Sequence, residues 1–480
     1  MEFPQPIASL RPASRPDNRI VEENSKPGTV EWQLQFHRFD TPITLASYPL
    51  NRYTRSSAIE GYASRTSVLP GETIDFMVSM RPAGKFLLDI YRMGYYGGMG
   101  GRHMARLGPF QAEPQPVPLM TVERLRECAW PQSAALTVPD EWPSGVYLGK
   151  LTREEPFGAQ SYIIFVVKDR RPSDLLCQVS DFTWQAYNKW PGKDSLYDDG
   201  TPEVWYTGPH VRVSFDRPYA KYCQCLEAPL SVGSGEFLLW EHPMTFWLEQ
   251  QGYDVAYCSN LDLHLDPSIL QTSKVFLSVG HDEYWSRQMY EAATKARDEG
   301  LSLAFFSGNS LDTEIILYES SVTGAPARAF ARKEPFADED KLMGVRSYGP
   351  GYGDWIVTQP AHWIYEGTGL QAGDKIPAII GWEYHGTPAD IPGLEVVASG
   401  PLYPRGSQEE TRHSAVVYPG PRGNWVFNAG TIWWPEGLSC PPGHIPARVG
   451  GVGGPFGVSP MVQRITANVL NRMIRESPRR

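Results

Sequence analysis

Apolar and polar residues alternate along the early part of the chain. In the segment 73–80 the apolar side chains take every second position, with mostly polar neighbours between them, which is typical of a half-buried strand. The segments 84–94 and 161–169 show a similar pattern, and turn-forming Pro and Gly residues separate such segments. Since no convincing helix lies between them, we predict an all-β sandwich over residues 45–170. The Pro-rich, polar residues 1–44 are expected to form an extended lead-in.

The pattern changes near residue 171, where short apolar runs without strict alternation begin. Four of these runs are the segments 175–180, 254–259, 274–279 and 301–306. Runs of this kind are expected for strands that are covered on both faces. Helical segments separate several of them, such as 287–299, which Ser286 can cap and Gly300 can end. Strands that alternate with helices favour parallel pairing, so we predict an α/β domain with a mostly parallel sheet over residues 171–480.

The end of the chain predicts a further helix. Ser459 suits the N-cap position, and Pro460 suits the first helical position. Apolar residues then recur at helical spacing, at Val462, Ile465, Val469 and Met473. We expect this stripe to pack against the core rather than to take part in function.

Composition places the chain among ordinary globular proteins, because 41% of its 480 residues are apolar and 20% are charged. The net charge of −10 argues against a nucleic-acid or anionic-membrane partner, since phosphate groups select basic surfaces. No stretch approaches about eighteen apolar residues, and the first residues do not resemble a signal peptide. We therefore expect a cytoplasmic protein without a membrane span.

The cysteine and serine patterns argue against a covalent nucleophile. Cys177 and Cys258 lie inside predicted strands, and Cys223 and Cys225 lie in a loop without an obvious base. A cysteine nucleophile would be expected at a turn from strand to helix, where this chain has none. The G-x-S-x-G motif of serine hydrolases is absent. So are the H-E-x-x-H motif and the paired cysteines that are typical of zinc sites.

Polar residues gather instead directly after the predicted strands. In open α/β sheets, ligands bind beyond the carboxyl ends of the strands, so residues at those positions are candidates for a site. They are Asp181, Tyr187, Asn188 and Tyr197 after the run 175–180, His281, Asp282, Glu283 and Tyr284 after 274–279, Asn309 after 301–306, and Glu383 and His385 after the apolar run 376–380. Four segments that are far apart in sequence thus converge, which favours an active site.

Each of these residues also has a structural explanation. The acidic pair of the "GHDE" motif could begin a helix, where a carboxylate meets the positive end of the helix dipole. The tyrosines could be core residues, Asn309 a turn residue and Glu383 a surface acid in a salt bridge. If the residues do converge, their phenol and carboxylate oxygens favour a hard cation, and tyrosine phenolate is a ligand of ferric iron.

Longer motifs resemble a known family. The segments "WQAYN" with "SLYD" (184–198), "GYDVAYCSNLDLH" (252–264), "SVGHDEYWS" (278–286), "LAFFSGN" (303–309) and "FNAGTI" (427–432) resemble the large, beta subunit-like chain of N,N-dimethylformamidases. The segments "IEGYASRTSVLPGETIDF" (59–76), "IYRMGYYGGMGGR" (90–102) and "SGVYLGKL" (144–151) are similar to the β-sandwich that precedes the second domain in this family. The resemblance covers residues 45–475, nearly the whole chain.

The resemblance implies a second domain similar in fold to class I glutamine amidotransferases, but without their nucleophilic cysteine. It also implies hydrolysis of the C–N bond of a small-molecule amide at a mononuclear ferric, Fe(III), centre. Carried over motif by motif, the metal ligands would be Tyr187, Tyr197 and Glu283, and the neighbouring catalytic groups would be His281, Asn309 and Glu383.

The resemblance leaves several alternatives open. The tract between Tyr187 and Tyr197 is short, so Tyr206 and Tyr219 compete for the place of the second ligand. The ion could instead be zinc, or no ion could bind. The family enzyme works with a small partner subunit, whereas this chain carries a long N-terminal segment of its own. Both a small subunit and a homo-oligomer therefore fit the sequence.

In the hydrolase hypothesis, Glu383 acts as general base, Asn309 donates a hydrogen bond to the developing oxyanion, and His281 orients groups or shuttles a proton. The same metal site could instead serve an oxidative or a lyase reaction. A third hypothesis is a non-enzymatic module that binds carbohydrate or protein, because the aromatic tract "RMGYYGGMGGRHM" (92–104) suits a sugar platform.

Overall fold

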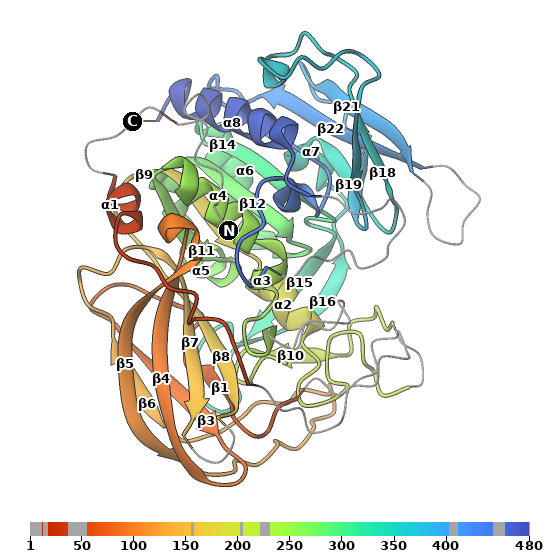
Figure 1. The fold of residues 1–480 in the computed structure, drawn as a ribbon. Helices are drawn as coiled ribbons and strands as arrows, with labels where there is room; N and C mark the ends of the chain where they lie inside the picture. The colour runs from red at the N-terminus through yellow and green to blue at the C-terminus, as the bar shows by residue number, and fades with distance from the viewer. Residues whose placement is uncertain are drawn as a thin grey trace.

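The computed structural model describes Pro12 and residues 18–36, 55–154, 158–201, 205–220, 231–402, 411–444 and 457–479. The chain forms two parts that pack side by side, an all-β part and a part in which helices surround a larger sheet (Figure 1). The first part ends with a strand that reaches Val167, and the second begins with a strand that starts at Ser173.

The all-β part consists of two sheets. One has the strand order β2 (Ser67–Val68), β8 (Gln160–Val167), β7 (Gly145–Arg153), β4 (Gly84–Met93) and β5 (Gly101–Ala112), and the other has the order β1 (Glu60–Ala63), β3 (Thr73–Ser79) and β6 (Ala134–Thr137). Ile74, Phe76 and Val78, which alternate along β3, are fully buried in the core between the sheets. The strand predicted over 73–80 is therefore confirmed, because the packing of the two sheets buries one face of β3.

The lead-in contains a short helix. α1 (Arg19–Asn24) begins after Asn18, whose side chain accepts hydrogen bonds from the backbone amides of Ile20 and Val21 at 3.0 and 3.2 Å. Ile20 is fully buried in a core that extends into the second part. The expectation of an extended lead-in is therefore wrong for residues 19–24, because an N-cap and a buried apolar side chain stabilise a helix there.

The second part is built around a seven-stranded sheet. Its order is β11 (Val255–Ser259), β9 (Ser173–Val179), β12 (Ser273–His281), β14 (Ser302–Gly308), β23 (Trp425–Asn428), β22 (Thr411–Pro419) and β21 (Glu395–Leu402). The first five strands run parallel, and β22 and β21 form an antiparallel edge. The four predicted apolar runs form β9, β11, β12 and β14, and nearly every residue of these strands is buried. Their apolar character without alternation follows from burial on both faces.

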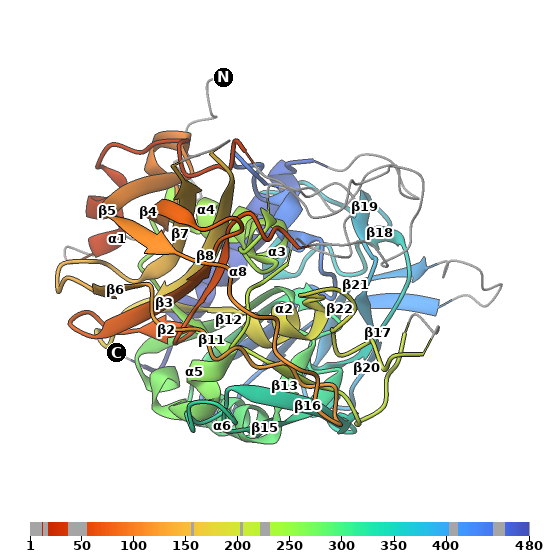
Figure 2. The same ribbon diagram turned by 90° about the horizontal axis from the view of Figure 1, so that it is seen from below.

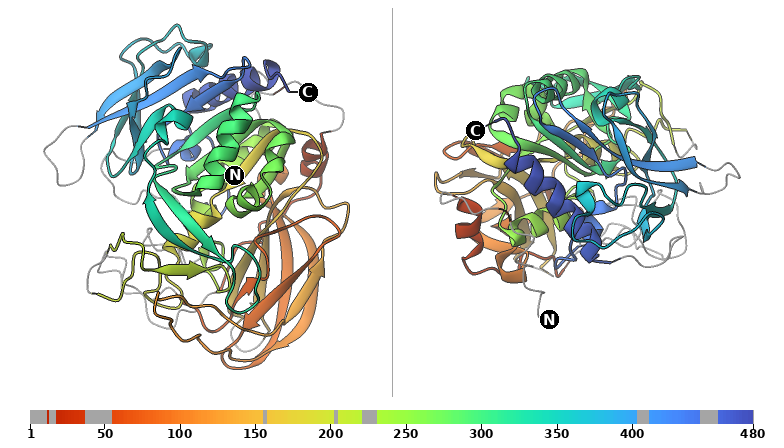
Figure 3. Two further views of the ribbon diagram at one scale, coloured as in Figure 1. Left: turned by 180° about the vertical axis from the view of Figure 1, so that it is seen from behind. Right: turned by 90° about the horizontal axis from the view of Figure 1, so that it is seen from above.

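Helices cover both faces of this sheet (Figures 1 and 3). α4 (His242–Gln251) and α8 (Pro460–Arg475) pack on one face, and α5 (Asn260–Leu265) and α6 (Arg287–Asp298) on the other. The predicted starts of α6 and α8 are confirmed. The Ser286 and Ser459 side chains accept hydrogen bonds from backbone amides of the first turns, at 3.2 and 3.4 Å. The predicted apolar stripe of α8 is fully buried.

Shorter elements complete this part. They are α2 (Asp181–Tyr187), α3 (Phe237–Trp240), α7 (Asp340–Met343), a four-stranded sheet of β10 (Arg212–Ser214), β16 (Ala329–Pro335), β15 (Thr313–Tyr318) and β13 (Tyr284–Ser286), and the antiparallel pairs β17 (Val345–Tyr348) with β20 (Tyr384–Pro388) and β18 (Gly353–Ile356) with β19 (Lys375–Ile380). The apolar run 376–380 thus belongs to β19 and pairs with β18 rather than with the parallel strands. In Figure 2, β13, β15 and β16 lie along one side of the molecule, close to α2.

A buried ion pair joins the two parts. Arg92 at the end of β4 contacts Glu249 of α4 at 2.8 Å, and both side chains are fully buried. The hydroxyl of Tyr257 donates to Glu249 at 2.9 Å, and the Arg92 guanidinium donates to the hydroxyl of Tyr96 at 2.9 Å. We call Arg92, Glu249, Tyr96 and Tyr257 the interface cluster.

The aromatic tract 92–104 does not form an exposed platform for a sugar. Tyr96 is buried in the interface cluster, and Tyr95 packs against Phe246 of α4, with ring centroids 5.2 Å apart. The tract therefore joins the two parts of the protein. Among the described residues, no helix combines the length and the apolar character needed to cross a membrane.

Candidate active site

The candidate site lies at the carboxyl ends of three neighbouring parallel strands. β9, β12 and β14 are adjacent in the sheet. α2 follows β9 and ends at Tyr187, while His281 is the last residue of β12 and pairs with Gly308, the last residue of β14. This is the edge at which parallel α/β sheets bind ligands.

The turn after β12 separates two neighbouring acids. Gly280 has a φ of +66°, and a Cβ at this position would lie 2.6 Å from the Cβ of Trp240, so the tight approach requires glycine. Beyond the turn, Asp282 accepts hydrogen bonds from Gln178, Asn260 and Ser278 at 2.9, 2.9 and 2.8 Å. Asp282 is therefore held by a buried polar network that fixes the turn.

Glu283 lies opposite the two predicted tyrosines. The hydroxyl of Tyr187 donates to Oε2 of Glu283 at 2.7 Å, and the hydroxyl of Tyr197 donates to Oε1 at 3.0 Å. The two hydroxyls lie 2.7 Å from each other, and all three side chains are buried. The structure therefore brings together the three residues that the resemblance implies as metal ligands. Neither Asp282 nor Glu283 caps a helix, because α6 starts four residues later and is capped by Ser286.

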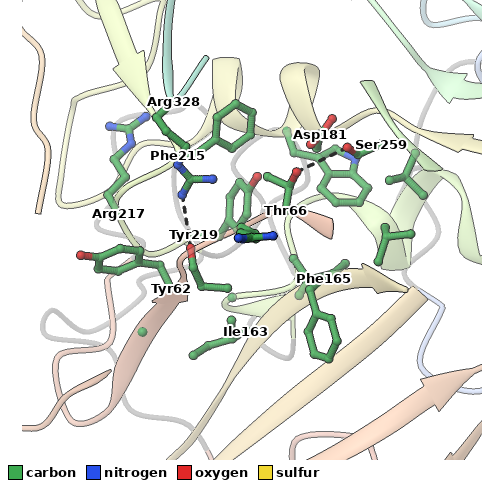
Figure 4. A pocket seen from close by; sticks show the side chains of 18 residues that line it. Tyr62, Thr66, Ile163, Phe165, Asp181, Phe215, Arg217, Tyr219, Ser259 and Arg328 are labelled. Carbon is green, nitrogen blue, oxygen red and sulfur yellow. Dashed lines mark hydrogen bonds between the residues drawn. The ribbon is translucent and has the colours of Figure 1, made fainter. Parts of the chain in front are cut away.

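The other two tyrosines lie elsewhere. Tyr219 lines a cavity of about 30 Å³ between the two parts of the protein, together with Tyr62, Asp181 and Arg328 (Figure 4). The hydroxyl of Tyr206 accepts a hydrogen bond from the backbone amide of His210 at 3.2 Å. Among the four tyrosines considered, Tyr187 and Tyr197 are the two whose hydroxyls bond to Glu283 within the described part of the chain.

His281 connects Glu283 with Glu383. Its Nε2 lies 2.5 Å from Oε2 of Glu383 and 3.2 Å from Oε2 of Glu283. Burial alone would lower the pKa of His281, but the two carboxylates raise it well above its ordinary value. Burial raises the pKa of Glu383, whereas His281 and Tyr187 lower that of Glu283 despite its burial. Glu383 is 8% exposed, so it is not a surface acid, and it lies in the connection between β19 and β20.

Asn309 is near these residues but not among their hydrogen-bond partners. It follows β14 and has a φ of +50°, in the left-handed region. The next residues approach the turn after β12, since the Leu311 and Thr313 amides donate to the carbonyls of Asp282 and Glu283 at 3.2 and 3.3 Å. Within the described residues, the Asn309 side chain makes no hydrogen bond to His281 or Glu283.

Burial affects the tyrosines and the cysteines alike. It raises the pKa of Tyr187 and Tyr197 well above the ordinary value, and the negative charge of Glu283 raises both further. With no cation present, both phenols therefore keep their protons at neutral pH and donate them to their neighbours. Burial also raises the pKa of the thiols of Cys177 and Cys258, and Cys223 and Cys225 lie outside the described residues.

The donor set fits a hard cation. Two phenol oxygens and a carboxylate lie within hydrogen-bond distance of one another in a buried site, and hard cations prefer such oxygen ligands. In the described part of the chain, no group of three or more His, Cys, Asp or Glu side chains has an arrangement that could hold a metal ion. Binding of an ion here would therefore depend on the tyrosines.

The sequence alone assigns no role to three residues that the structure places at the site. The hydroxyl of Tyr284 lies 2.6 Å from that of Tyr197, and Arg332 of β16 donates to the hydroxyl of Tyr284 at 2.7 Å. Trp205, which is 46% exposed, meets the ring of Tyr197 edge to face at 4.9 Å. Tyr284 follows the "GHDE" motif directly. Nothing in the sequence marks Trp205, a few residues after Tyr197, or Arg332, which comes from the distant strand β16.

Fold and site together define a β-sandwich joined to an α/β part that carries a buried set of phenol and carboxylate oxygens at the strand ends. The family model described as "N,N-dimethylformamidase beta subunit-like, C-terminal" matches residues 87–447. The chain belongs to this family and is a dimethylformamidase-like protein.

The other comparisons add no argument. None of the curated proteins matches the chain. Among solved structures, a cycloisomaltooligosaccharide glucanotransferase from Paenibacillus sp., complexed with cycloisomaltoheptaose, aligns with 75% of this chain and 68% of its own, at 9% identity. Its TM-score of 0.17 is too low to support any statement about fold or function.

Proposed function

We propose that the protein is a hydrolase that cleaves the C–N bond of a small, non-peptide amide. The observation that carries this proposal is the meeting of Tyr187, Tyr197 and Glu283 through hydrogen bonds of 2.7 to 3.0 Å, in a chain of the dimethylformamidase-like family. These three residues would hold a mononuclear ferric ion. We also propose that the parallel strand order reflects an α/β fold related to class I glutamine amidotransferases.

Charge supports the choice of a trivalent ion. Two phenolates and one carboxylate carry three negative charges, which a ferric ion balances, and an unbalanced buried charge is costly. When bound, such an ion supplies a positive charge that polarises an amide carbonyl and makes a water molecule more acidic.

His281 and Glu383 would handle the protons. Oε2 of Glu383 and Nε2 of His281 lie 2.5 Å apart and form a close ion pair, so we assign proton transfer at the site to these two side chains. The raised pKa of Glu383 suits a general base, since a carboxylate with a higher proton affinity accepts a proton from water more readily. His281 also lies 3.2 Å from Glu283 and would orient both carboxylates.

Asn309 would contact the carbonyl oxygen of the substrate. Its backbone is fixed in the left-handed region, directly after the strand that pairs with β12. From this position, its side-chain amide would donate a hydrogen bond to the oxygen that gains negative charge during attack. Trp205 and Trp382 would limit the entry of water, since Trp382 packs against His281 with ring centroids 5.7 Å apart.

Metal analysis combined with an amine-release assay tests the proposal. The purified chain should contain about one iron per molecule and a visible tyrosinate-to-iron absorption band, and it should release amine from formamides or other small amides. Tyr187→Phe should lose iron and activity, whereas Tyr253→Phe, a buried tyrosine of the opposite core, should retain both. Iron binding that survives Tyr187→Phe and Glu283→Ala would refute the ligands, and iron-loaded protein that oxidises or eliminates instead would refute hydrolysis.

A further inference from the structure

We propose that Arg332, acting through Tyr284, is a positioning residue that stabilises the negative charge on Tyr197 and thereby makes the two phenol ligands inequivalent. This inference rests on the proposed ferric centre. It concerns a guanidinium and a phenol that lie outside the three implied ligands and contact only one of them.

Arg332 is a buried cation next to the phenols. Its guanidinium carbon lies 4.1 Å from the centre of the Tyr197 ring, and the side chain is 5% exposed. It donates to the hydroxyl of Tyr284 at 2.7 Å and to the backbone carbonyls of Leu196 and Tyr206 at 2.8 and 3.2 Å. The bond to Leu196 ties Arg332 to the residue directly before Tyr197.

The charge of Arg332 has no direct carboxylate partner. In the interface cluster Arg92 meets Glu249 at 2.8 Å, and elsewhere Arg328 meets Asp216 at 2.7 Å. No carboxylate of the described residues lies within ion-pair distance of Arg332. Glu283 interacts with this charge at longer range, whereas the direct contacts of the guanidinium at the site are the Tyr284 hydroxyl and the Tyr197 ring.

Tyr284 can relay this effect to Tyr197. Because the Tyr284 oxygen accepts a hydrogen bond from Arg332, its own hydrogen is free to point at the Tyr197 oxygen, 2.6 Å away. A hydrogen bond donated to a phenolate stabilises its charged form. The backbone amide of Glu283 donates to the hydroxyl of Thr183 at 3.0 Å, which fixes the segment that carries Tyr284.

Tyr187 lacks such a chain of donors. Its hydroxyl contacts Glu283 and the hydroxyl of Tyr197, both at 2.7 Å. His281 lies beside the Tyr187 ring, with ring centroids 5.4 Å apart, but its Nε2 faces Glu383 and Glu283 rather than the phenol oxygen. The oxygen of Tyr197 would therefore accept a hydrogen bond from Tyr284 that the oxygen of Tyr187 lacks, so Tyr197 would donate less electron density to a bound ion and Tyr187 would be the stronger donor. The two ligands, alike in residue type, thus differ through a cation on β16.

The test uses the full chain loaded with ferric iron, with the visible absorption band and chelator competition as readouts. Tyr284→Phe keeps the ring but removes the hydrogen bond, so Tyr197 should donate more strongly and the band should move to longer wavelength. Loss of this outer-shell hydrogen bond should also weaken iron binding about 10- to 100-fold, in the range found for outer-shell partners.

Arg332→Gln should reproduce both changes, and Arg332→Lys, which keeps the charge, should restore part of the affinity. Tyr418→Phe is the matched control, because Tyr418 is a buried tyrosine that accepts a hydrogen bond from Arg297 at 3.1 Å, remote from the site. It should leave band and affinity unchanged. If Arg332→Gln does not fold, Tyr284→Phe decides.

The outcomes separate the two proposals. Wild-type chain that binds iron and shows the band, with Tyr284→Phe indistinguishable from it, would overturn the role of Arg332 and leave the ferric centre standing. Wild-type chain that binds no iron and shows no band would overturn the centre and this inference together.

Discussion

The interface cluster and the candidate site are both buried, both contain tyrosines beside a glutamate, and yet they differ in how charge is balanced. In the interface cluster, Glu249 faces Arg92 at 2.8 Å, and the tyrosines only add hydrogen bonds. In the site, Glu283 faces two phenols directly, and the imidazole next to it is shared with Glu383. The interface cluster is built around one direct ion pair, whereas the site gathers phenol oxygens around its carboxylate, and under the proposed function these oxygens would hold a cation.

The largest effect on stability should come from removing the carboxylate of the interface cluster. Glu249→Ala leaves Arg92 buried without its carboxylate and should lower the free energy of unfolding by about 3 to 5 kcal/mol, as measured by urea denaturation. The exposed Glu291→Ala on α6 should change it by less than about 0.5 kcal/mol. If the two variants were equally stable, the cluster would not hold the two parts together.

Glu283→Gln should change the stability little but weaken iron binding strongly. The amide oxygen can still accept from Tyr187, so the metal-free chain should lose no more than about 1 kcal/mol of stability. Iron binding should weaken by more than the roughly 100-fold seen for outer-shell partners. Glu383→Gln is the control, because Glu383 contacts His281 rather than the tyrosines, and it should keep iron while losing activity. An equal loss of iron in both variants would contradict the ligand assignment.

A buried histidine of β22 provides a third case. Burial lowers the pKa of His413 to about 4, although its bond to the Ala429 carbonyl opposes this. The unfolded chain therefore takes up a proton near pH 6.5, and the native chain only near pH 4. Stability is full above about pH 6.5 and falls as the pH drops towards 4, by about 3 kcal/mol for this residue.

Urea denaturation at pH 7.5 and pH 5 measures this loss. His413→Gln should show a smaller difference between the two pH values than the wild-type chain, whereas the exposed His210→Gln should show the same difference as wild type. A pH dependence that His413→Gln leaves unchanged would assign the acid sensitivity to other groups.

The smallest effect should come from the rim of the site. Trp205→Ala removes an edge-to-face contact with Tyr197 that is worth about 0.5 to 1.5 kcal/mol. Chelator should therefore remove iron a few-fold faster from this variant. Phe36→Ala, which truncates an exposed aromatic residue of the lead-in, should leave this rate unchanged, and a rate equal to wild type for Trp205→Ala would show that Trp205 does not cover the site.

Local patterns in the sequence predict the elements that carry the site. The runs that form β9, β12 and β14 are apolar because both faces of the sheet are covered, and the polar residues after them are visible without a structure. The motifs also identify Tyr187, Tyr197 and Glu283, which the structure brings together.

Such local patterns do not predict which distant strands pair. The position of Arg332 depends on β16 lying antiparallel to β15, and that of Glu383 on the connection after β19, which pairs with β18. The periodicity likewise predicts neither the antiparallel edge formed by β22 and β21 nor the short capped helix α1. These features depend on partners that only the folded chain brings close.

Only Asp282 and Glu283 separate β12 from β13, although these strands belong to two different sheets. Glu283 therefore lies in a two-residue connection between two sheets, here called the two layers. Tyr187 follows a strand of one layer, and Arg332 lies on a strand of the other. A small tilt of either layer would pull the oxygens apart. A ligand bound to all three oxygens would therefore link the two layers and raise the temperature at which the protein unfolds.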